Sequence, residues 1–412
     1  MGGRRAPITA PRRADCAARD EADALAGLRD FFDLPDGLIY LDGNSLGPLP
    51  RPAIARVNRT LRTEWGQGLI RSWDSAGWWD KPLALGARIA PLIGARPEEV
   101  IVGDSTSVNT FKVVVAALRM RPDRRVIVTD RDNFPTDLYI IDSAAELAGD
   151  YSVRRVETPD DAAGAIDESV ALVALTHVDY RSARLYPMAE ITRAAHDNGA
   201  VIIWDLSHSV GAVPLDVDGC DVDFAVGCTY KFLNGGPGSP AFVFAASRLH
   251  DVARQPLVGW HGHARPFGFE PAYVPAPGIR RFACGTPPIL SYASLEGSLE
   301  VWDHVELAAL LAKGQELCDL LIELLEPCFV PGRFELVSPR DPRLRGSQVT
   351  LRHPEARSFL AALARRGVIG DHREPDLVRL GIAPLYLRFV DIWDAADTIR
   401  EILSAGRVAR RD

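Results

Sequence analysis

Lysine is scarce in this chain. The 412 residues include 47 lysines and arginines together, and the lysines are Lys81, Lys112, Lys231 and Lys313. Chemistry that needs a primary amine therefore has four side chains to draw on. The sequence around Lys81, Lys112 and Lys313 is helical or turn-like, so we expect these three lysines to be exposed.

Features that would indicate other locations or partners are also missing. The net charge is −8, without the basic stripe that a general nucleic-acid surface needs. No apolar run approaches the roughly eighteen residues of a membrane span. No apolar stretch follows the amino-terminal arginines, as it would in a secretory signal. This tail is expected to be a disordered or loosely docked arm.

Paired cysteines are absent as well. The six cysteines form no Cys-x-x-Cys pair, so no metal site is predicted. Scattered thiols in a chain of this length are typical of reduced core residues in a cytoplasmic protein.

The chain does contain short apolar runs that alternate with helical patterns from Val100 onward. Runs such as Val126 to Val128 and Val201 to Ile203 are apolar throughout, which is typical of strands that helices bury on both faces. Strands are predicted at 100–102, 125–129, 152–156, 170–175, 200–204, 222–228 and 241–245. Helices are predicted at 21–33, 51–66, 80–93, 106–119, 136–148 and 187–198. This pattern predicts an α/β protein with a mostly parallel central sheet.

The pattern changes after about residue 290. Long helical patterns over 291–326 precede strands near 333–337 and 347–351 and helices at 355–366 and 393–404. We therefore predict an amino-terminal segment over 1–60 that packs with a small domain, a large domain over 61–290, and a small α+β domain over 291–412. Segment 254–288 is rich in glycine, proline and aromatic residues and too long for a plain connection, so we expect it to be functional.

Polar residues follow several predicted strands, at the sheet edge where α/β proteins bind ligands. Ser105-Thr106-Ser107 opens a helix, where its hydroxyl and N–H groups either bind an anion or cap the helix. Asp205 follows an apolar strand, with His208 three residues on. This carboxylate either holds a protonated pyridine nitrogen or caps a turn. Phe134 either stacks on a ring or opens a helix ahead of Pro135.

Lys231 ends another apolar run, which begins at Phe224. A position directly after a buried strand makes an amine available as a nucleophile. The loop Asn234-Gly235-Gly236-Pro237-Gly238 lets the backbone approach a ligand. Asp205 and Lys231, each ending a strand, together indicate a pyridoxal 5′-phosphate (PLP) site in which Lys231 carries the cofactor.

Several motifs are more specific than these single residues. They are Tyr40-Leu-Asp-Gly-Asn-Ser-Leu-Gly, Gly103-Asp-Ser-Thr-Ser-Val-Asn, Phe134-Pro-Thr-Asp, Trp204-Asp-Leu-Ser-His-Ser-Val-Gly, Cys228-Thr-Tyr-Lys-Phe-Leu-Asn-Gly-Gly-Pro-Gly, Pro287-Pro-Ile-Leu and Ala383-Pro-Leu-Tyr. In this order, over about residues 38–395, the chain resembles the kynureninase family of fold-type-I PLP enzymes in the aminotransferase superfamily.

The resemblance implies a role for each matching residue. Lys231 would carry the cofactor, Asp205 would hold its pyridine nitrogen, and Tyr230 would contact the phosphate and transfer protons. The other cofactor-binding residues that it implies are Thr106, Ser107, Phe134, Asp137, Thr176, His208, Trp260 and Thr286. Trp260 and Thr286 would reach the site of the other subunit, which implies a homodimer with shared active sites.

The substrate side of the site is implied in the same way. Arg379 would clamp a carboxylate, as its planar fork suits, and Trp73 would wall an aryl pocket. Gly285 with Thr286 is like the bacterial members and favours an unsubstituted ring. His261 stands where an apolar residue is expected, so it would also lie near the substrate pocket and influence which aryl ring is accepted. His261 and His263 form a His-x-His pair for which no third metal ligand is apparent.

The reaction implied is hydrolytic cleavage of the Cβ–Cγ bond of L-kynurenine to anthranilate and L-alanine. It would serve tryptophan catabolism, NAD biosynthesis or another pathway that uses anthranilates, and 3-hydroxykynurenine stays open as a substrate. One alternative is another class V aminotransferase-like enzyme such as a cysteine desulfurase, for which Cys284 is the candidate thiol. A second is a non-catalytic protein that kept the fold.

Overall fold

The computed structural model describes residues 11–408 and divides into two compact units. The larger unit comprises Leu46–Tyr180 and Arg184–Asp303, and the smaller one comprises the chain up to Ser45, Arg181–Ala183 and the chain from His304. The sequence placed these divisions at residues 60 and 290. The observed divisions fall after Ser45 and Asp303 instead, because helix α2 (Arg51–Arg59) packs on helix α8 (Ile289–Glu300) inside the larger unit.

The larger unit is built on a seven-stranded sheet with the order β2-β8-β7-β6-β5-β3-β4. The strands are β2 (Val100–Val102), β3 (Val126–Asp130), β4 (Ser152–Val156), β5 (Val170–Thr176), β6 (Val201–Asp205), β7 (Phe224–Gly227) and β8 (Phe242–Ala245). Only β8 runs against its neighbours β2 and β7. The predicted α/β fold with a mostly parallel sheet is therefore confirmed.

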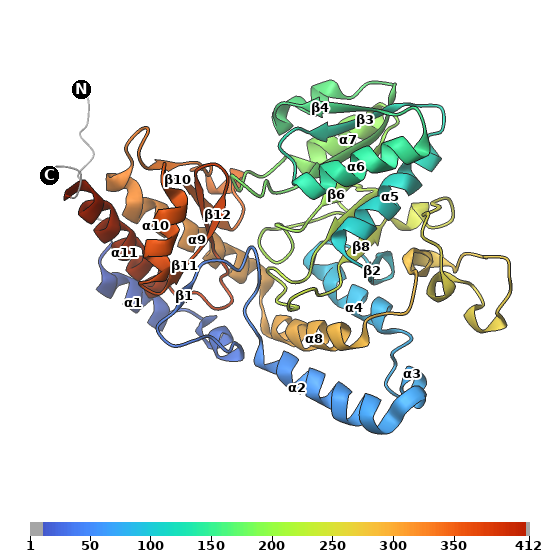
Figure 1. Cartoon of the computed structure of the whole chain (residues 1–412), viewed down its shortest axis with the longest axis horizontal. Coiled ribbons are helices and arrows are strands. Elements are labelled where there is room, and N and C mark those ends of the chain that lie inside the picture. Colours follow the sequence, from blue (N-terminus) through green and yellow to red (C-terminus); the bar gives the residue numbers. More distant parts are fainter. Residues whose placement is uncertain (1–10, 409–412) are drawn as a thin grey trace. The chain divides into compact units, whose positions relative to one another are not determined.

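Helices bury this sheet and account for its continuous apolar runs. All seven residues of β5 and all five of β6 are buried. Helices α5 (Thr106–Met120) and α6 (Pro135–Ala148) pack against each other along the sheet (Figure 1), and α7 (Met188–Asp197) packs on β6. Helix α4 (Lys81–Ile89) packs on β2.

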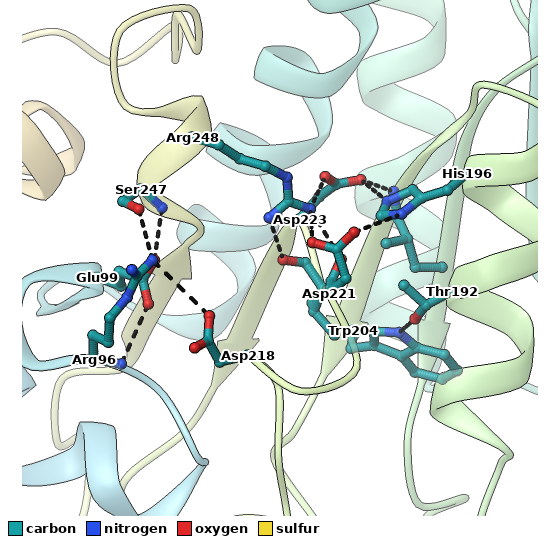
Figure 2. A network of polar contacts seen from close by, with 12 residues as sticks. Arg96, Glu99, Thr192, His196, Trp204, Asp218, Asp221, Asp223, Ser247 and Arg248 are labelled. Carbon is teal, nitrogen blue, oxygen red and sulfur yellow. Dashed lines mark hydrogen bonds and ion pairs between the residues drawn. The ribbon is translucent and has the colours of Figure 1, made fainter.

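The two ends of the parallel strands carry different chemistry. At the amino ends of β6 and β7, Figure 2 shows His196 and Arg248 around the carboxylates of Asp221 and Asp223. His196 Nε2 lies 3.0 Å from Asp223 Oδ2, and Asp223 also accepts the N–H of Ile202 at 2.9 Å. This network ties α7 and two strands together, so it stabilises the edge opposite the residues that follow the carboxyl ends.

The smaller unit is an α+β assembly. Its antiparallel sheet has the order β12-β13-β10-β9, and β1 pairs with β11 in a separate parallel ribbon. The strands are β1 (Ile39–Tyr40), β9 (Glu335–Leu336), β10 (Gln348–Arg352), β11 (Val368–Ile369), β12 (Asp371–Arg373) and β13 (Leu377–Gly381). The helices are α1 (Arg13–Glu21), α9 (Leu307–Leu325), α10 (Ala356–Ala364) and α11 (Phe389–Val408).

The amino-terminal part of this unit differs from expectation. Residues 1–10 of the expected arm lie outside the described residues, but from residue 11 the chain is docked: Arg13 pairs with Asp394 at 2.7 Å. The predicted helix over 21–33 is wrong, since α1 ends at Glu21 and only a 3-10 helix (Ala26–Phe31) follows. The chain turns there because Asp20 accepts the N–H groups at the start of α11 and Asp23 pairs with Lys313.

Segment 254–288 has little regular structure. It contains only the 3-10 helices Trp260–Gly262, Pro266–Gly268 and Gly278–Phe282. None of the helices among residues 11–408 is long and apolar enough to cross a membrane.

Candidate functional site

Lys231 differs from the other lysines in its partner. The expectation that the other three are exposed is wrong: Lys81, Lys112 and Lys313 are buried. Each of them is paired with a carboxylate, at 2.6 Å from Glu296, 2.5 Å from Asp104 and 2.7 Å from Asp23 respectively. Among the four lysines, all within residues 11–408, only Lys231 has no ion pair. Its amine is therefore the one of the four that no carboxylate holds in an ion pair.

The partner of Lys231 is His208. Nζ of Lys231 lies 2.8 Å from Nε2 of His208, and the histidine is buried in the turn after β6. Since one nitrogen must donate the hydrogen and the other accept it, the pair can hold a mobile proton. The sequence placed both residues near the cofactor without predicting this contact, because β6 and β7 are separated by some twenty residues of chain.

Asp205 ends β6 and shares a hydrogen bond with Asp137 in the first turn of α6. Burial first, and the neighbouring charge of Asp205 second, raise the pKa of Asp137 well above its ordinary value. Asp137 therefore stays protonated and donates to Asp205, which also accepts the N–H of Ser207 at 2.7 Å. Buried hydrogen bonds of this kind fix the orientation of the Asp205 carboxylate.

Adjacent strand ends bring more of the predicted residues to this edge. Thr176, the last residue of β5, lies opposite Asp205 in the register of β5 and β6. Phe134 precedes α6 and is 40% exposed, with its ring at 89° to that of Tyr180. An aromatic ring left half-exposed at this edge is available to stack on a planar ligand.

The start of α5 carries Thr106 and Ser107, the residues predicted to bind an anion. Ser105 caps the helix by accepting the N–H of Val108 at 3.3 Å, so capping is part of its role. The N–H groups of Thr106 and Ser107, in the first turn, have no acceptor within the helix. Lys112 steadies the loop before them by binding Asp104 and the carbonyl of Phe282 at 2.7 Å.

Tyr230 adjoins Lys231, whose Nζ lies 5.9 Å from the centre of its ring. Burial first, and Cys228 second, raise the pKa of Tyr230 above its ordinary value. The phenol therefore keeps its proton at neutral pH and can act as a donor.

Trp73 and Trp260 belong to an aromatic cluster that sequence reasoning missed. Their rings are 6.0 Å apart, and Trp79 lies 5.3 Å from Trp260 and 4.3 Å from His261. His261 is 1% exposed, and its Nε2 is buried without a hydrogen-bond partner. Burial first lowers its pKa to about 4, so the ring is neutral at neutral pH. The pair Trp78-Trp79 was the available sequence signal.

Gly285 and Thr286 are exposed, and nothing lies within 4 Å of where a side chain on Gly285 would begin. His263 is engaged by its own loop, since Nδ1 accepts the N–H of Arg265 at 2.8 Å. In the described part of the chain, no group of three or more histidine, cysteine, aspartate or glutamate side chains is arranged to hold a metal ion.

Arg379 lies in the smaller unit on β13 and is fully buried. Its Nε donates to Asp371 Oδ1 at 2.6 Å and its Nη2 to Ser45 Oγ at 2.9 Å. The guanidinium is thus fixed in orientation by its own unit. Arg379 was singled out through the family resemblance, and no sequence signal pointed to Asp371 as its partner.

Comparisons with known proteins agree on one family. The family model described as "Kynureninase C-terminal domain" matches residues 310–399. A kynureninase from Pseudomonas fluorescens is 50% identical over 396 residues, which cover 95% of each chain. A kynureninase from Burkholderia mallei (strain SAVP1) is 48% identical with the same coverage.

Solved structures are alike in fold. The apo structure of a cysteine desulfurase from Thermococcus onnurineus NA1 has a TM-score of 0.79 at 20% identity and covers 92% of this chain and 98% of its own. A mutant of C-DES with glycine covalently linked to its PLP cofactor has a TM-score of 0.78 at 16% identity, covering 90% of this chain and 98% of its own. At such low identity these likenesses establish the fold alone.

Proposed function

The chain belongs to the kynureninase family, and on that premise we propose that it hydrolyses the Cβ–Cγ bond of L-kynurenine to anthranilate and L-alanine. The observation that carries the proposal is the pair formed by Lys231 and His208, next to a strand end that carries Asp205. A lysine without a carboxylate partner suits an amine that must act as a nucleophile and a base.

The cofactor is PLP, and the residues of the larger unit fit it. An oriented carboxylate at Asp205 suits a protonated ring nitrogen, and the half-exposed ring of Phe134 suits stacking. The first-turn N–H groups of Thr106 and Ser107 suit the phosphate. When bound, PLP supplies an electrophilic carbon for the amine and a ring that accepts the electrons released from the substrate.

Proton transfers are the work of this chain's own side chains. Lys231 would remove the proton from Cα of the substrate, and His208, at 2.8 Å from Nζ, is placed to share that proton. Water adds to the γ-carbonyl before the carbon–carbon bond breaks. Tyr230, which its raised pKa keeps protonated, donates to the carbon left behind. In the smaller unit, Arg379 binds the α-carboxylate of the substrate.

A homodimer is part of the proposal, with Trp260 and Thr286 completing the phosphate site of the other subunit. Apolar side chains support it: Leu69 and Ile70 are 58% and 76% exposed, and Phe267 and Phe269 are 67% and 84% exposed. Exposed apolar side chains of this size support the proposal, because burial against a partner subunit would remove them from water. All six cysteines are free thiols, which supports a reducing, cytoplasmic location.

The test is conversion of L-kynurenine by the purified protein supplied with PLP. We expect anthranilate, followed by its fluorescence, and an equal amount of L-alanine, and we expect neither from Lys231→Ala. Borohydride reduction and peptide mapping should find the cofactor on Lys231. Cofactor on Lys81, Lys112 or Lys313 would overturn the assignment. Sulfide release from L-cysteine, without anthranilate from kynurenine, would favour a desulfurase instead.

A further inference from the structure

The guanidinium of Arg379 lies in a cluster of charges within the smaller unit. Asp371 Oδ1 accepts a hydrogen bond from Nε of Arg379 at 2.6 Å, and Asp371 Oδ2 forms an ion pair with Arg373 at 3.0 Å. Ser45 Oγ lies 2.9 Å from Arg379 Nη2 and 2.5 Å from Asp371 Oδ2. The carboxylate of Asp371 is therefore already paired with both Arg373 and Arg379.

Asp42 brings a second carboxyl group to this cluster. It follows β1, bridges to Gly381 at the end of β13, and shares a side-chain hydrogen bond with Ser45. Its other oxygen, Oδ1, is buried and has no hydrogen-bond partner. A buried, unpartnered oxygen costs more free energy on an ionised carboxylate than on a protonated one.

The single proton of the Ser45 hydroxyl decides between the two carboxyl groups. Ser45 donates it to Asp371 Oδ2 and accepts a hydrogen bond from Arg379. Because Asp371 takes that proton, Ser45 offsets the burial of Asp42 only in part, and Oδ1 of Asp42 still has no donor. The geometry therefore favours a proton on Asp42.

The charges that face Asp42 act in both directions, and burial together with the charge of Asp371 outweighs the others. Burial first, and the charge of Asp371 second, raise the pKa of Asp42 to about 7, against the opposing pull of Ser45, Arg379 and Arg373. The phenols of Tyr40 and Tyr386 also face it. Their own pKa values are raised, that of Tyr40 to about 12, so both stay neutral.

We propose that Asp42 is a positioning residue for Arg379, which holds a proton while a substrate carboxylate is bound and releases it when the arginine carries no substrate at alkaline pH. The inference rests on the proposed role of Arg379 in binding that carboxylate. A bound carboxylate adds a negative charge beside Asp371. With Asp42 ionised, three carboxylates would share two arginines, so binding and protonation of Asp42 favour each other.

The first test is the pH dependence of KM for L-kynurenine. In the parent, KM should rise as pH increases above about 7, because Asp42 of the substrate-free enzyme ionises there. Asp42→Asn mimics the protonated acid and should flatten this profile. We expect its KM at pH 8 to be about three- to tenfold below that of the parent and to match the parent at pH 6, because pH 8 is one unit above the pKa of Asp42 and one pH unit changes the protonated fraction at most about tenfold. The change should fall on KM and not on kcat.

Asp42→Glu is the matched control, since it keeps a titrating carboxyl group and should keep a pH-dependent KM. A KM profile that is the same in the parent and in Asp42→Asn would overturn the proposal while leaving kynurenine cleavage intact. Failure of the parent to cleave kynurenine at all would instead overturn the proposed function.

A binding measurement does not depend on turnover. The probe is 4-(2-aminophenyl)-4-oxobutanoate, the substrate skeleton without its α-amine, titrated into the holoenzyme by calorimetry at pH 8 in buffers of different ionisation enthalpy. The parent should take up a fraction of a proton as the probe binds, and Asp42→Asn should take up less. Binding by the parent without proton uptake would contradict the proposal even if the variant did not fold.

Discussion

Asp137 and Asp205 share a buried hydrogen bond, in which Asp137 is the donor. The raised pKa of Asp137 keeps it a neutral acid, so Asp205 is the carboxylate that can face a positively charged ring nitrogen. The two residues should therefore respond differently to the same amide substitution.

We expect Asp205→Asn to lower kcat about a hundredfold or more, on the scale seen when one preorganised electrostatic partner is removed. PLP should still be retained to a large extent. Asp137→Asn is the matched comparison, because an amide resembles the neutral acid and can still donate to Asp205, and its loss should be much smaller. Steady-state kinetics with the PLP content of each variant provide the measurement. Near-normal turnover by Asp205→Asn with stoichiometric PLP would contradict the role.

Gly285 and His261 bear on whether the substrate ring can carry a hydroxyl group. Unsubstituted L-kynurenine should be preferred over 3-hydroxykynurenine by roughly tenfold, since a buried hydroxyl without a partner costs about 1–3 kcal/mol. Gly285 has no side chain to offer one, and the free Nε2 of His261 is closed off inside the aromatic cluster. The measurement is the ratio of the two kcat/KM values in the parent and in His261→Phe. A parent that prefers the hydroxylated substrate, with the preference lost in the variant, would assign the choice to His261.

At the scale of elements, α7 is fastened to the sheet by a histidine that titrates. Hydrogen bonding to Asp223 first raises the pKa of His196, against partial burial, and Asp221 and Arg248 complete the network in Figure 2. Because the folded-state pKa is raised, this contribution to stability is fully present below the unfolded pKa of about 6.5 and is lost as pH rises through the folded value.

His196→Gln should therefore lower the free energy of unfolding more at pH 5.5 than at pH 8.5, by on the order of 1 kcal/mol at the lower pH, as for a half-exposed charged hydrogen bond. Urea unfolding at the two pH values measures this difference. His304→Gln is the control, since His304 is exposed and forms no ion pair among residues 11–408. An equal effect of His196→Gln at both pH values would show that its charge is not involved.

At the scale of the whole molecule, the proposed shared sites can be tested by mixing two inactive variants. Lys231→Ala keeps Trp260, and Trp260→Ala keeps Lys231, so a hybrid dimer with shared sites has one intact site. Random exchange makes half of the dimers hybrids, which predicts recovery of about a quarter of the parent activity. Activity no greater than the average of the separate variants, or a fully active monomer in sedimentation, would contradict shared sites.

The sequence by itself determined where the strands of the central sheet lie along the chain and which polar residues come at or after their carboxyl ends. Apolar runs followed by polar residues identify buried parallel strands, because such strands leave polar positions mainly at their ends. Asp205 is the last residue of β6, as predicted, but Lys231 does not end a strand, since β7 stops four residues earlier at Gly227. The resemblance of the motifs identified the family that the relatives then confirmed.

Only the tertiary structure decided which side chains meet. Burial of the other three lysines depends on residues that pack against them from elsewhere in the fold. The contact of His208 with Lys231 joins two separate strand ends, and the hydrogen bond from Arg379 to Asp371 joins two strands that were not predicted. Helical or turn context reports on nearest neighbours, whereas the burial and charge of a side chain depend on what packs against it from elsewhere. For this reason the sequence identified Arg379, whereas only the structure shows that Asp371 and Ser45 bind it and that Asp42 lies near it.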